Sequence, residues 1–140
     1  MAGFTNAARF SRRLRAIPPA VRKAVRDQLR ANAEDLVQGI QRAVPVEDGT
    51  LRSTVENEDT SNERRIRQTV RAGGERTTRP VRKSAKGNAP TYDYALAQEF
   101  GTSDMPANPF FYPTYRAKRK AFKRALNAAV KKAVASTKTP

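Results

Sequence analysis

Apolar residues recur with the spacing of one helical face between residues 19 and 44. Pro19 suits the first turn of a helix, whereas Pro45 cannot continue one. The pattern therefore predicts an amphipathic helix over this stretch, with Arg and Lys on its polar side. A second, shorter pattern of Phe10, Leu14 and Ile17 predicts an N-terminal helix that ends at the Pro18-Pro19 pair. The main stripe consists of Val21, Val25, Leu29, Ala33, Leu36, Ile40 and Val44.

Two runs of alternating apolar and polar residues follow, at 51–58 and 65–72, and predict an antiparallel hairpin. A turn at Thr60 and Ser61 buries the apolar pairs together and neutralises charge on the outer face. The same register places Glu58 opposite Glu63, so we expect the end of the hairpin to fray. The pairs it predicts are Val55 with Ile66, Leu51 with Val70 and Glu56 with Arg65.

A long C-terminal helix is predicted from near Pro113 to about Ala135. Its apolar stripe consists of Tyr115, Phe122, Leu126, Ala129, Val130 and Ala133. Residues 73–90, by contrast, hold one sizeable apolar residue, Val81, and are not expected to form core. A loop of this length in a compact domain is either functional or disordered until a partner binds.

These elements predict an α+β fold with N-terminal helices and a long C-terminal helix packed on a small antiparallel sheet. At 140 residues the chain is expected to form a single domain over 1–140. Within it, residues 1–18 form a helical extension and residues 73–90 form a flexible basic loop.

The chain is strongly basic, and its charges lie in separate blocks. Its net charge is +15, from 28 basic and 13 acidic side chains. Residues 47–63 carry six acidic and one basic side chain, whereas residues 64–86 carry nine basic and one acidic. Such a surface attracts polyanions, so nucleic acid or an acidic protein is the expected partner. The segregated blocks also suggest that opposite charges meet, within a protomer or between neighbours.

Several kinds of chemistry are missing from the composition. The chain has no Cys and no His, so disulfides, thiolate zinc sites, cysteine nucleophiles and the commonest general base are absent. We therefore expect no catalytic activity, no cofactor and no metal. No apolar run approaches the roughly 20 residues that a membrane span needs, and the N-terminus lacks the apolar stretch of a signal peptide. A soluble protein made in the cytoplasm is the expectation.

Residues 92–113 concentrate aromatic side chains and prolines. They hold six of the ten aromatic residues and three of the nine prolines. Aromatic residues dominate core and interface energetics, so the segment is interpreted as a docking element, although all its aromatics could instead pack on the hairpin. Gly101 is expected to take a positive φ at a helix C-terminus, followed by an extended strap fixed by Pro106 and Pro109. Glu99 has no catalytic partner in sequence, so we expect it to cap a helix or pair with an Arg.

Two basic segments are candidates for contact with phosphate. The loop cations could form a mobile arm that binds phosphate or inserts into a neighbouring subunit, or they could belong to a solvated linker. The basic face of the last helix (Arg116, Lys118, Arg119, Lys120, Lys123, Arg124) is more often the wet side of an amphipathic helix than a nucleic-acid site. The loop cations are Arg76, Arg79, Arg82, Lys83 and Lys86.

Two separated motifs resemble one known family. Residues 44–55, Val-Pro-Val-Glu-Asp-Gly-Thr-Leu-Arg-Ser-Thr-Val, resemble the pattern Pro-Val-Asp-Thr-Gly-x-Leu-Arg-x-Ser-Ile. Residues 94–113 resemble the pattern Tyr-Ala…Glu-Phe-Gly-Thr…Pro-Ala-x-Pro-Phe-x-x-Pro. Together, and followed by a terminal amphipathic helix, they are similar to the tail-completion (tail terminator, or neck) proteins of long-tailed bacteriophages and of gene transfer particles. Glu47-Asp48 departs from the family's Asp-Thr, and Thr114 stands where the family tends to have Ala.

The resemblance covers roughly residues 20–135 and implies a structural virion protein without enzymatic activity. Such a protomer assembles into a ring, of six copies in this family, that caps the tail tube, ends its polymerisation and joins it to the head-side connector. DNA passes through the lumen with non-specific contacts, which the loop cations named above could supply. The alternative from a different class is a small basic nucleic-acid-binding protein. The motif residues that the resemblance assigns to the ring interface are Gly49, Leu51, Arg52, Tyr94, Ala95, Glu99, Phe100, Gly101, Thr102, Pro109, Phe110 and Pro113.

Overall fold

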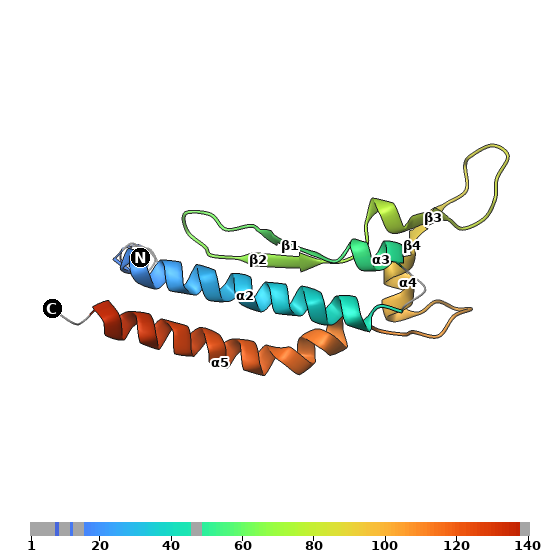
Figure 1. The fold of residues 1–140 in the computed structure, drawn as a ribbon. Coiled ribbons are helices and arrows are strands. Elements are labelled where there is room, and N and C mark those ends of the chain that lie inside the picture. The colour runs from blue at the N-terminus through green and yellow to red at the C-terminus, as the bar shows by residue number, and fades with distance from the viewer. Residues whose placement is uncertain (1–7, 9–11, 13–15, 46–48, 138–140) are drawn as a thin grey trace, which may run out of the picture.

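The computed structural model describes residues 8, 12, 16–45 and 49–137, and it has the α+β fold that the sequence predicts (Figure 1). The expected N-terminal helix over residues 1–18 and the Glu47-Asp48 part of the first motif lie mostly outside the described residues. The elements, in chain order, are α2 (Pro19–Ala43), α3 (Gly49–Ser53), β1 (Glu56–Asp59), β2 (Gln68–Arg71), η1 (Glu75–Thr77), β3 (Thr78–Pro80), β4 (Thr91–Asp93), α4 (Tyr94–Phe100) and α5 (Tyr112–Thr137).

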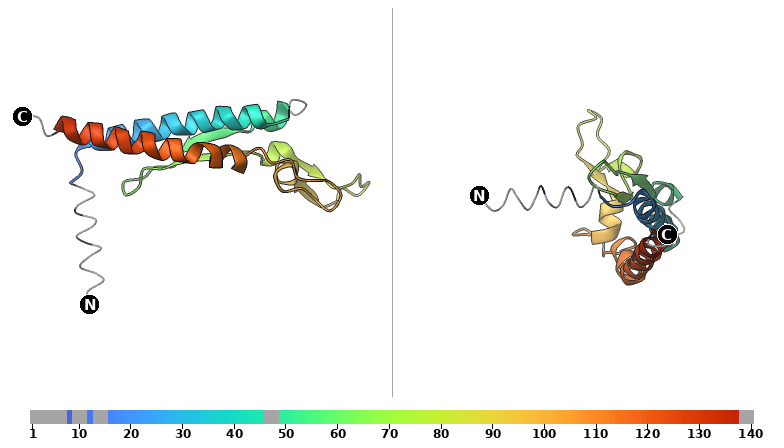
Figure 2. Two further views of the ribbon diagram at one scale, coloured as in Figure 1. Left: turned by 90° about the horizontal axis from the view of Figure 1, so that it is seen from below. Right: turned by 90° about the vertical axis from the view of Figure 1, so that its left-hand side faces the viewer.

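The two long helices run antiparallel, side by side, along the length of the molecule (Figures 1 and 2). Both were predicted, and their bounds agree with the prediction to within a few residues. The Asn32 side chain donates to the Phe122 carbonyl at 3.3 Å, and the Lys118 ammonium lies 2.9 Å from the Asp35 carboxylate. These polar contacts set the register of α2 against α5.

The predicted stripe of α5 is wrong at its first residue, Tyr115, which is exposed. The face that α5 turns toward α2 there carries Thr114 and Lys118 instead. Both approach Gly39 of α2 so closely that an added Cβ at Gly39 would lie 2.7 Å from Lys118 Cε. The further stripe residues are buried or half-buried, as expected of the packed side.

The hairpin lies along α2 on the side away from α5, but its first strand and its register differ from the prediction (Figure 1). Residues 49–53 form the helix α3, because the Ser53 and Thr54 hydroxyls donate back to the Thr50 and Leu51 carbonyls and close a helical turn. The strand therefore starts only at Glu56. Leu51 is buried from this helix and not from a strand.

The observed register pairs Glu56 with Arg71 and Asn57 with Val70, and the turn lies at residues 63–64. Asn62 stabilises this later turn, since its backbone N–H donates to the Arg65 carbonyl at 2.8 Å. Glu58 then opposes Thr69, so the predicted repulsion with Glu63 is also wrong. The charge of Glu56 is neutralised across the hairpin by Arg71 and not by the predicted Arg65. Arg71 contacts Glu56 at 2.8 Å and Glu58 at 3.5 Å.

A second two-stranded sheet, β3 with β4, joins the two ends of the segment that was predicted to be a structureless loop. Thr77 within this segment is fully buried, although the hydrophobic core contains no residue of 73–90. The reason is that its hydroxyl finds polar partners in Asp93 and Gly74. Beyond Pro80 the chain forms a loop, residues 81–90, that extends away from the body of the molecule (Figure 1).

The main core lies at one end of the helix pair, where α3, α4 and the start of α5 meet the C-terminal end of α2. Its buried members come from α2, α3, α4, the connections that follow α2 and α3, and the strap, so the strap segment is part of the folded core. They are Leu36, Ile40, Val44, Leu51, Val55, Ala95 and Phe110.

Candidate assembly interface

Asp93 ties the base of the 81–90 loop to α4. It directly precedes the helix and caps it by accepting from the Ala95 N–H at 2.9 Å. The same carboxylate accepts from the Gly74 N–H at 2.8 Å and from the Thr77 hydroxyl at 2.6 Å. One side chain therefore holds the start of α4 against the segment that leads into β3.

The pKa of Asp93 is shifted by two opposed effects. Burial raises it, but the hydrogen bonds from Thr77, Gly74 and Ala95 outweigh burial and hold the pKa below its ordinary value of 3.8. A depressed carboxyl pKa contributes stability that is present above the ordinary pKa and is lost as the pH falls through the folded-state pKa.

We therefore expect Asp93→Asn to lower the free energy of unfolding by about 1–2 kcal/mol near neutral pH, because the amide cannot accept all three bonds. The difference in the free energy of unfolding between wild type and Asp93→Asn should become smaller below about pH 4, where the wild-type carboxylate protonates. Denaturant unfolding of both proteins across this pH range measures this difference. A difference that stays constant down to strong acid would show that the Asp93 carboxylate does not stabilise the fold in this way.

Gly101 ends α4 and turns the chain back. Its φ of +76° confirms the predicted positive φ, and its N–H donates to the Ala97 carbonyl at 2.8 Å. An added Cβ would lie 2.7 Å from the Ala107 backbone nitrogen, so no other residue fits. The returning strap is then bonded to α4, since Asn108 N–H donates to the Gln98 carbonyl at 2.8 Å.

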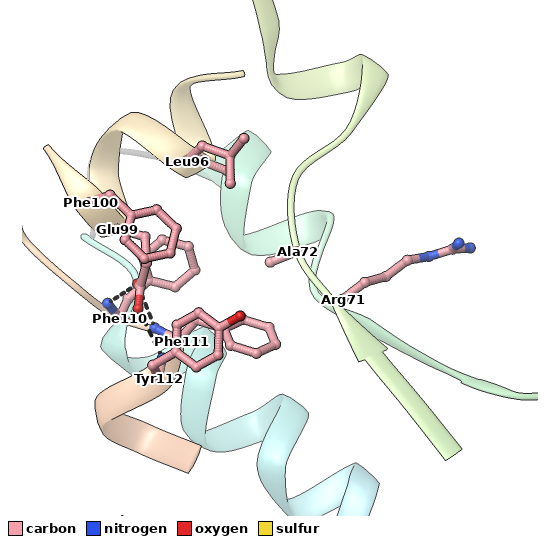
Figure 3. Close-up of a pocket in the computed structure, with 9 residues that line it drawn as sticks. Arg71, Ala72, Leu96, Glu99, Phe100, Phe110, Phe111 and Tyr112 are labelled. Atoms are coloured by element: carbon pink, nitrogen blue, oxygen red, sulfur yellow. Dashed lines mark hydrogen bonds between the residues drawn. The ribbon is translucent and has the colours of Figure 1, made fainter. Parts of the chain in front are cut away.

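Glu99 forms a clamp on the start of α5 (Figure 3). Its side chain is buried, and Oε2 accepts from the backbone N–H groups of Phe110 and Phe111 at 2.7 and 2.9 Å. Oε1 accepts from the N–H of Tyr112 at 2.9 Å. These donors have no partners within a helix, and a carboxylate at a helix N-terminus is favourable. The prediction of a structural role for Glu99, by capping, is confirmed.

Next to this clamp lies a surface of apolar side chains, here named the α4–α5 aromatic surface and defined as Leu96, Phe100, Phe111 and Tyr112, of which Phe111 alone is half-buried. Leu96, Phe100 and Tyr112 are 61%, 63% and 48% exposed. The Tyr112 ring lies 6.1 Å from that of Phe100 and 5.4 Å from that of Phe111, between centroids. Tyr112 therefore contacts both other rings, while Phe100 and Tyr112 remain largely open to solvent.

A shallow hollow of about 200 Å³ opens between these side chains and is also lined by Ala72 and Ala95 (Figure 3). Phe110 lines its floor and is 2% exposed. Arg71 borders the hollow, but its guanidinium points away from the rings, toward its carboxylate partners on β1 (Figure 3). The hollow is thus apolar, with Glu99 as its one buried charge, already satisfied by three donors.

The five loop cations do not form one group. Arg79 lies with its guanidinium 5.5 Å from the centroid of the Tyr94 ring and donates to the Arg76 and Thr78 carbonyls. Arg76 and Arg79 thus belong to the base of the loop, in η1 and β3. Arg82, Lys83 and Lys86 lie exposed in the 81–90 loop.

The residues of the two motifs divide into scaffold and surface. Leu51, Ala95, Glu99 and Phe110 are buried and hold the fold together. Phe100, Thr102 and Pro109 are exposed, Arg52, Tyr94 and Pro113 are half-buried, Gly49 begins α3, and Gly101 caps α4. Their role in a ring interface stays a prediction. Sequence reasoning missed Asp93 and Leu96, although an Asp before a helical run is a capping signal and Leu96 precedes Phe100 by one turn.

A comparison with known protein families identifies a phage tail-component family, in agreement with the resemblance of the two motifs. Residues 8–101 match the family model described as "HK97-gp10_like: Bacteriophage HK97-gp10, putative tail-component". The match extends from the N-terminal region to Gly101, through α2, both sheets and α4. The chain matches no curated protein and no solved structure. Among the described residues, no helix is long and apolar enough to cross a membrane.

Proposed function

We propose that this chain, which belongs to the HK97-gp10-like family of bacteriophage tail components, is a structural protein of the virion neck that assembles into a ring. In this proposal the ring, of six copies, caps the tail tube, ends its polymerisation and joins it to the head-side connector. DNA passes through its lumen. The same role fits a true phage or a gene transfer particle.

The observation that carries this proposal is the α4–α5 aromatic surface. Contiguous apolar side chains that remain exposed on a folded protomer mark interaction sites, and aromatic residues are the usual anchors of such sites. Within the described part of the chain, all large apolar side chains that are exposed lie between Val81 and Tyr115. Residues 81–115 lie at one end of the molecule (Figure 1), which suits a defined contact with a neighbour.

The rigidity of this surface supports the same conclusion. The Glu99 clamp fixes Phe111 and Tyr112, and the Gly101 turn fixes the end of α4 that presents Phe100. A preorganised surface loses little conformational entropy on binding. In a ring, one surface of each protomer contacts a different surface of the next, so the partner of the α4–α5 aromatic surface is another part of the neighbouring copy.

The test replaces Leu96 and Phe100 together, Leu96→Ser with Phe100→Ser, in particles produced with this variant as the sole copy. We expect a folded protomer but a loss of joined particles by roughly tenfold or more, because hot-spot residues each contribute about 2 kcal/mol or more. Electron microscopy of tails and heads, with thermal unfolding of the purified protein, measures both.

Val81→Ser is the matched control, since Val81 is 62% exposed on the 81–90 loop and lies outside the proposed surface. It should leave particle yield unchanged. Normal yield with the double variant, or an equal loss with Val81→Ser, would contradict the proposed interface.

A further inference from the structure

The outer face of α5 carries a continuous row of cations. Residues that pack against α2, such as Phe122 and Ala133, occupy one side of the helix. Helical geometry then places a set of exposed cations on the opposite side. These outer-face cations are Arg116, Lys120, Lys123, Arg124 and Lys131.

This row is not neutralised by the protomer. The segment of α5 contains eight basic side chains and no acidic one. Lys118, which points toward α2, pairs with Asp35 at 2.9 Å, but within the described residues no outer-face cation has an ion-pair partner. Two cations of α2, by contrast, have partners, since Lys23 pairs with Asp27 on the same helix and Arg30 lies 3.9 Å from Asp59 on the hairpin.

Further copies of the chain add more positive than negative charge. The hairpin of a second copy holds several carboxylates that could contact α5. However, residues 56–71 contain four acidic and four basic side chains and are neutral as a whole. Arg71 already contacts two of the four carboxylates, Glu56 and Glu58. Each added copy also brings a net charge of +15, so self-assembly increases the excess.

The chemistry of this face favours nucleic acid over an acidic protein. Protein interfaces are anchored by buried aromatic or large aliphatic side chains, and the outer face has Ala117, Ala121 and Asn127 beside its cations instead. From Arg116 to Lys131 the row spans about 22 Å at the rise of an α-helix. A duplex carries one phosphate charge per about 1.7 Å of axis, so a stretch of that length offers many phosphates to these side chains.

We propose that the outer face of α5 binds the phosphate backbone of double-stranded nucleic acid, without sequence preference. This inference rests on the proposed function in that DNA passes the ring. Its test nevertheless uses duplex binding by the purified full chain, which needs no tail or particle. Normal particle joining by the Leu96 and Phe100 double variant, with duplex binding that depends on α5, would count against the ring alone. Duplex binding that does not depend on α5, with particle joining lost as expected in the double variant, would count against this inference alone.

The experiment measures the affinity for a short labelled duplex over a series of salt concentrations, for two matched triple variants. The α5 variant is Lys120→Gln, Lys123→Gln and Arg124→Gln, and the loop variant is Arg82→Gln, Lys83→Gln and Lys86→Gln. Each lowers the net charge from +15 to +12, so they differ only in where the charge is removed. All six residues are exposed, and circular dichroism checks that both variants fold.

We expect the α5 variant to bind roughly tenfold more weakly, with the slope of log affinity against log salt reduced by about 2–3, as expected for three lost phosphate contacts. The loop variant should keep the wild-type slope. Equal losses of duplex affinity in the two variants would show that binding depends only on net charge. A larger loss of affinity in the loop variant would show that the duplex binds at the 81–90 loop. Either result overturns the inference, as would displacement of the duplex by polyglutamate at equal charge concentration, which would indicate an acidic protein partner.

Discussion

Replacing Phe110 with Ala is expected to lower the free energy of unfolding by about 3–5 kcal/mol, the usual cost of deleting a buried aromatic ring. Phe110 is 2% exposed and packs in the main core with residues of α2, α3 and α4. Its removal leaves a cavity at the point where these elements meet the start of α5. Denaturant unfolding of the purified protein measures the effect.

Phe100→Ala is the matched control, because it deletes the same ring at the end of α4, at a position that is 63% exposed. We expect it to change the free energy of unfolding by less than about 1 kcal/mol. If Phe110→Ala fails to fold, Phe110→Leu fills most of the volume and should be measurably destabilised but folded. Equal, small effects of Phe110→Ala and Phe100→Ala would show that Phe110 is not core.

This pair of variants also separates folding from assembly. Phe110 stands among the residues that the family resemblance assigns to the ring interface, but in the folded protomer its side chain is part of the core. An assembly defect in Phe110→Ala therefore reports loss of the fold. Only substitutions on the α4–α5 aromatic surface, such as those at Leu96 and Phe100, can test docking.

The sequence predicts the helices well because their signals are long and redundant. Seven apolar positions with one period, bounded by Pro19 and Pro45, leave little freedom in placing α2. The C-terminal helix has the same kind of signal. Its one error, Tyr115, lies where the close approach of Lys118 and Thr114 to Gly39 turns a different side of α5 toward α2. That approach depends on how two distant segments meet.

The hairpin register could not be predicted because its strands are mostly polar. A strand pair without a strongly apolar face leaves the register weakly specified by the hydrophobic pattern. The observed register is stabilised by side-chain hydrogen bonds that periodicity does not report, Asn57 to Gln68 at 3.1 Å and Thr60 to Thr69 at 2.7 Å. Arginines at several positions of the second run also allow charge to be neutralised in more than one register.

The candidate site was predicted in its parts but not in its geometry. Gly101 and Glu99 each had a recognisable local role in the sequence. The contact between Glu99 and the N–H groups of residues 110–112, however, requires the strap to fold back onto α4. No local sequence pattern predicts that the strap folds back in this way. The bond from Thr77 to Asp93 likewise closes a segment whose composition predicts only a loop.

Glu99→Ala is expected to be the second strongly destabilising change, by about 3 kcal/mol or more, because hydrogen bonds to a charged acceptor contribute about 1.5–3 kcal/mol each. Three backbone donors lose their acceptor at once, and the Phe110 N–H lies in the core where water does not replace it. Glu99→Gln should be intermediate, since its amide oxygen still accepts while its NH₂ group faces a donor. Glu34→Ala, which removes an exposed carboxylate from α2, is the matched control and should have little effect.

Hydrogen exchange distinguishes this clamp from a general loss of stability. In Glu99→Gln the amides of residues 110–112 should lose protection before those of the central part of α2, because only the former lose an acceptor. Unchanged protection at these amides would contradict the clamp. Since the clamp also sets where Phe111 and Tyr112 stand relative to Phe100, Glu99→Gln should reduce particle joining even at temperatures where the protomer is folded. If the Glu99→Gln protein folds but fails to join particles, the hydrogen bonds of the buried Glu99 side chain are needed to position the α4–α5 aromatic surface for assembly.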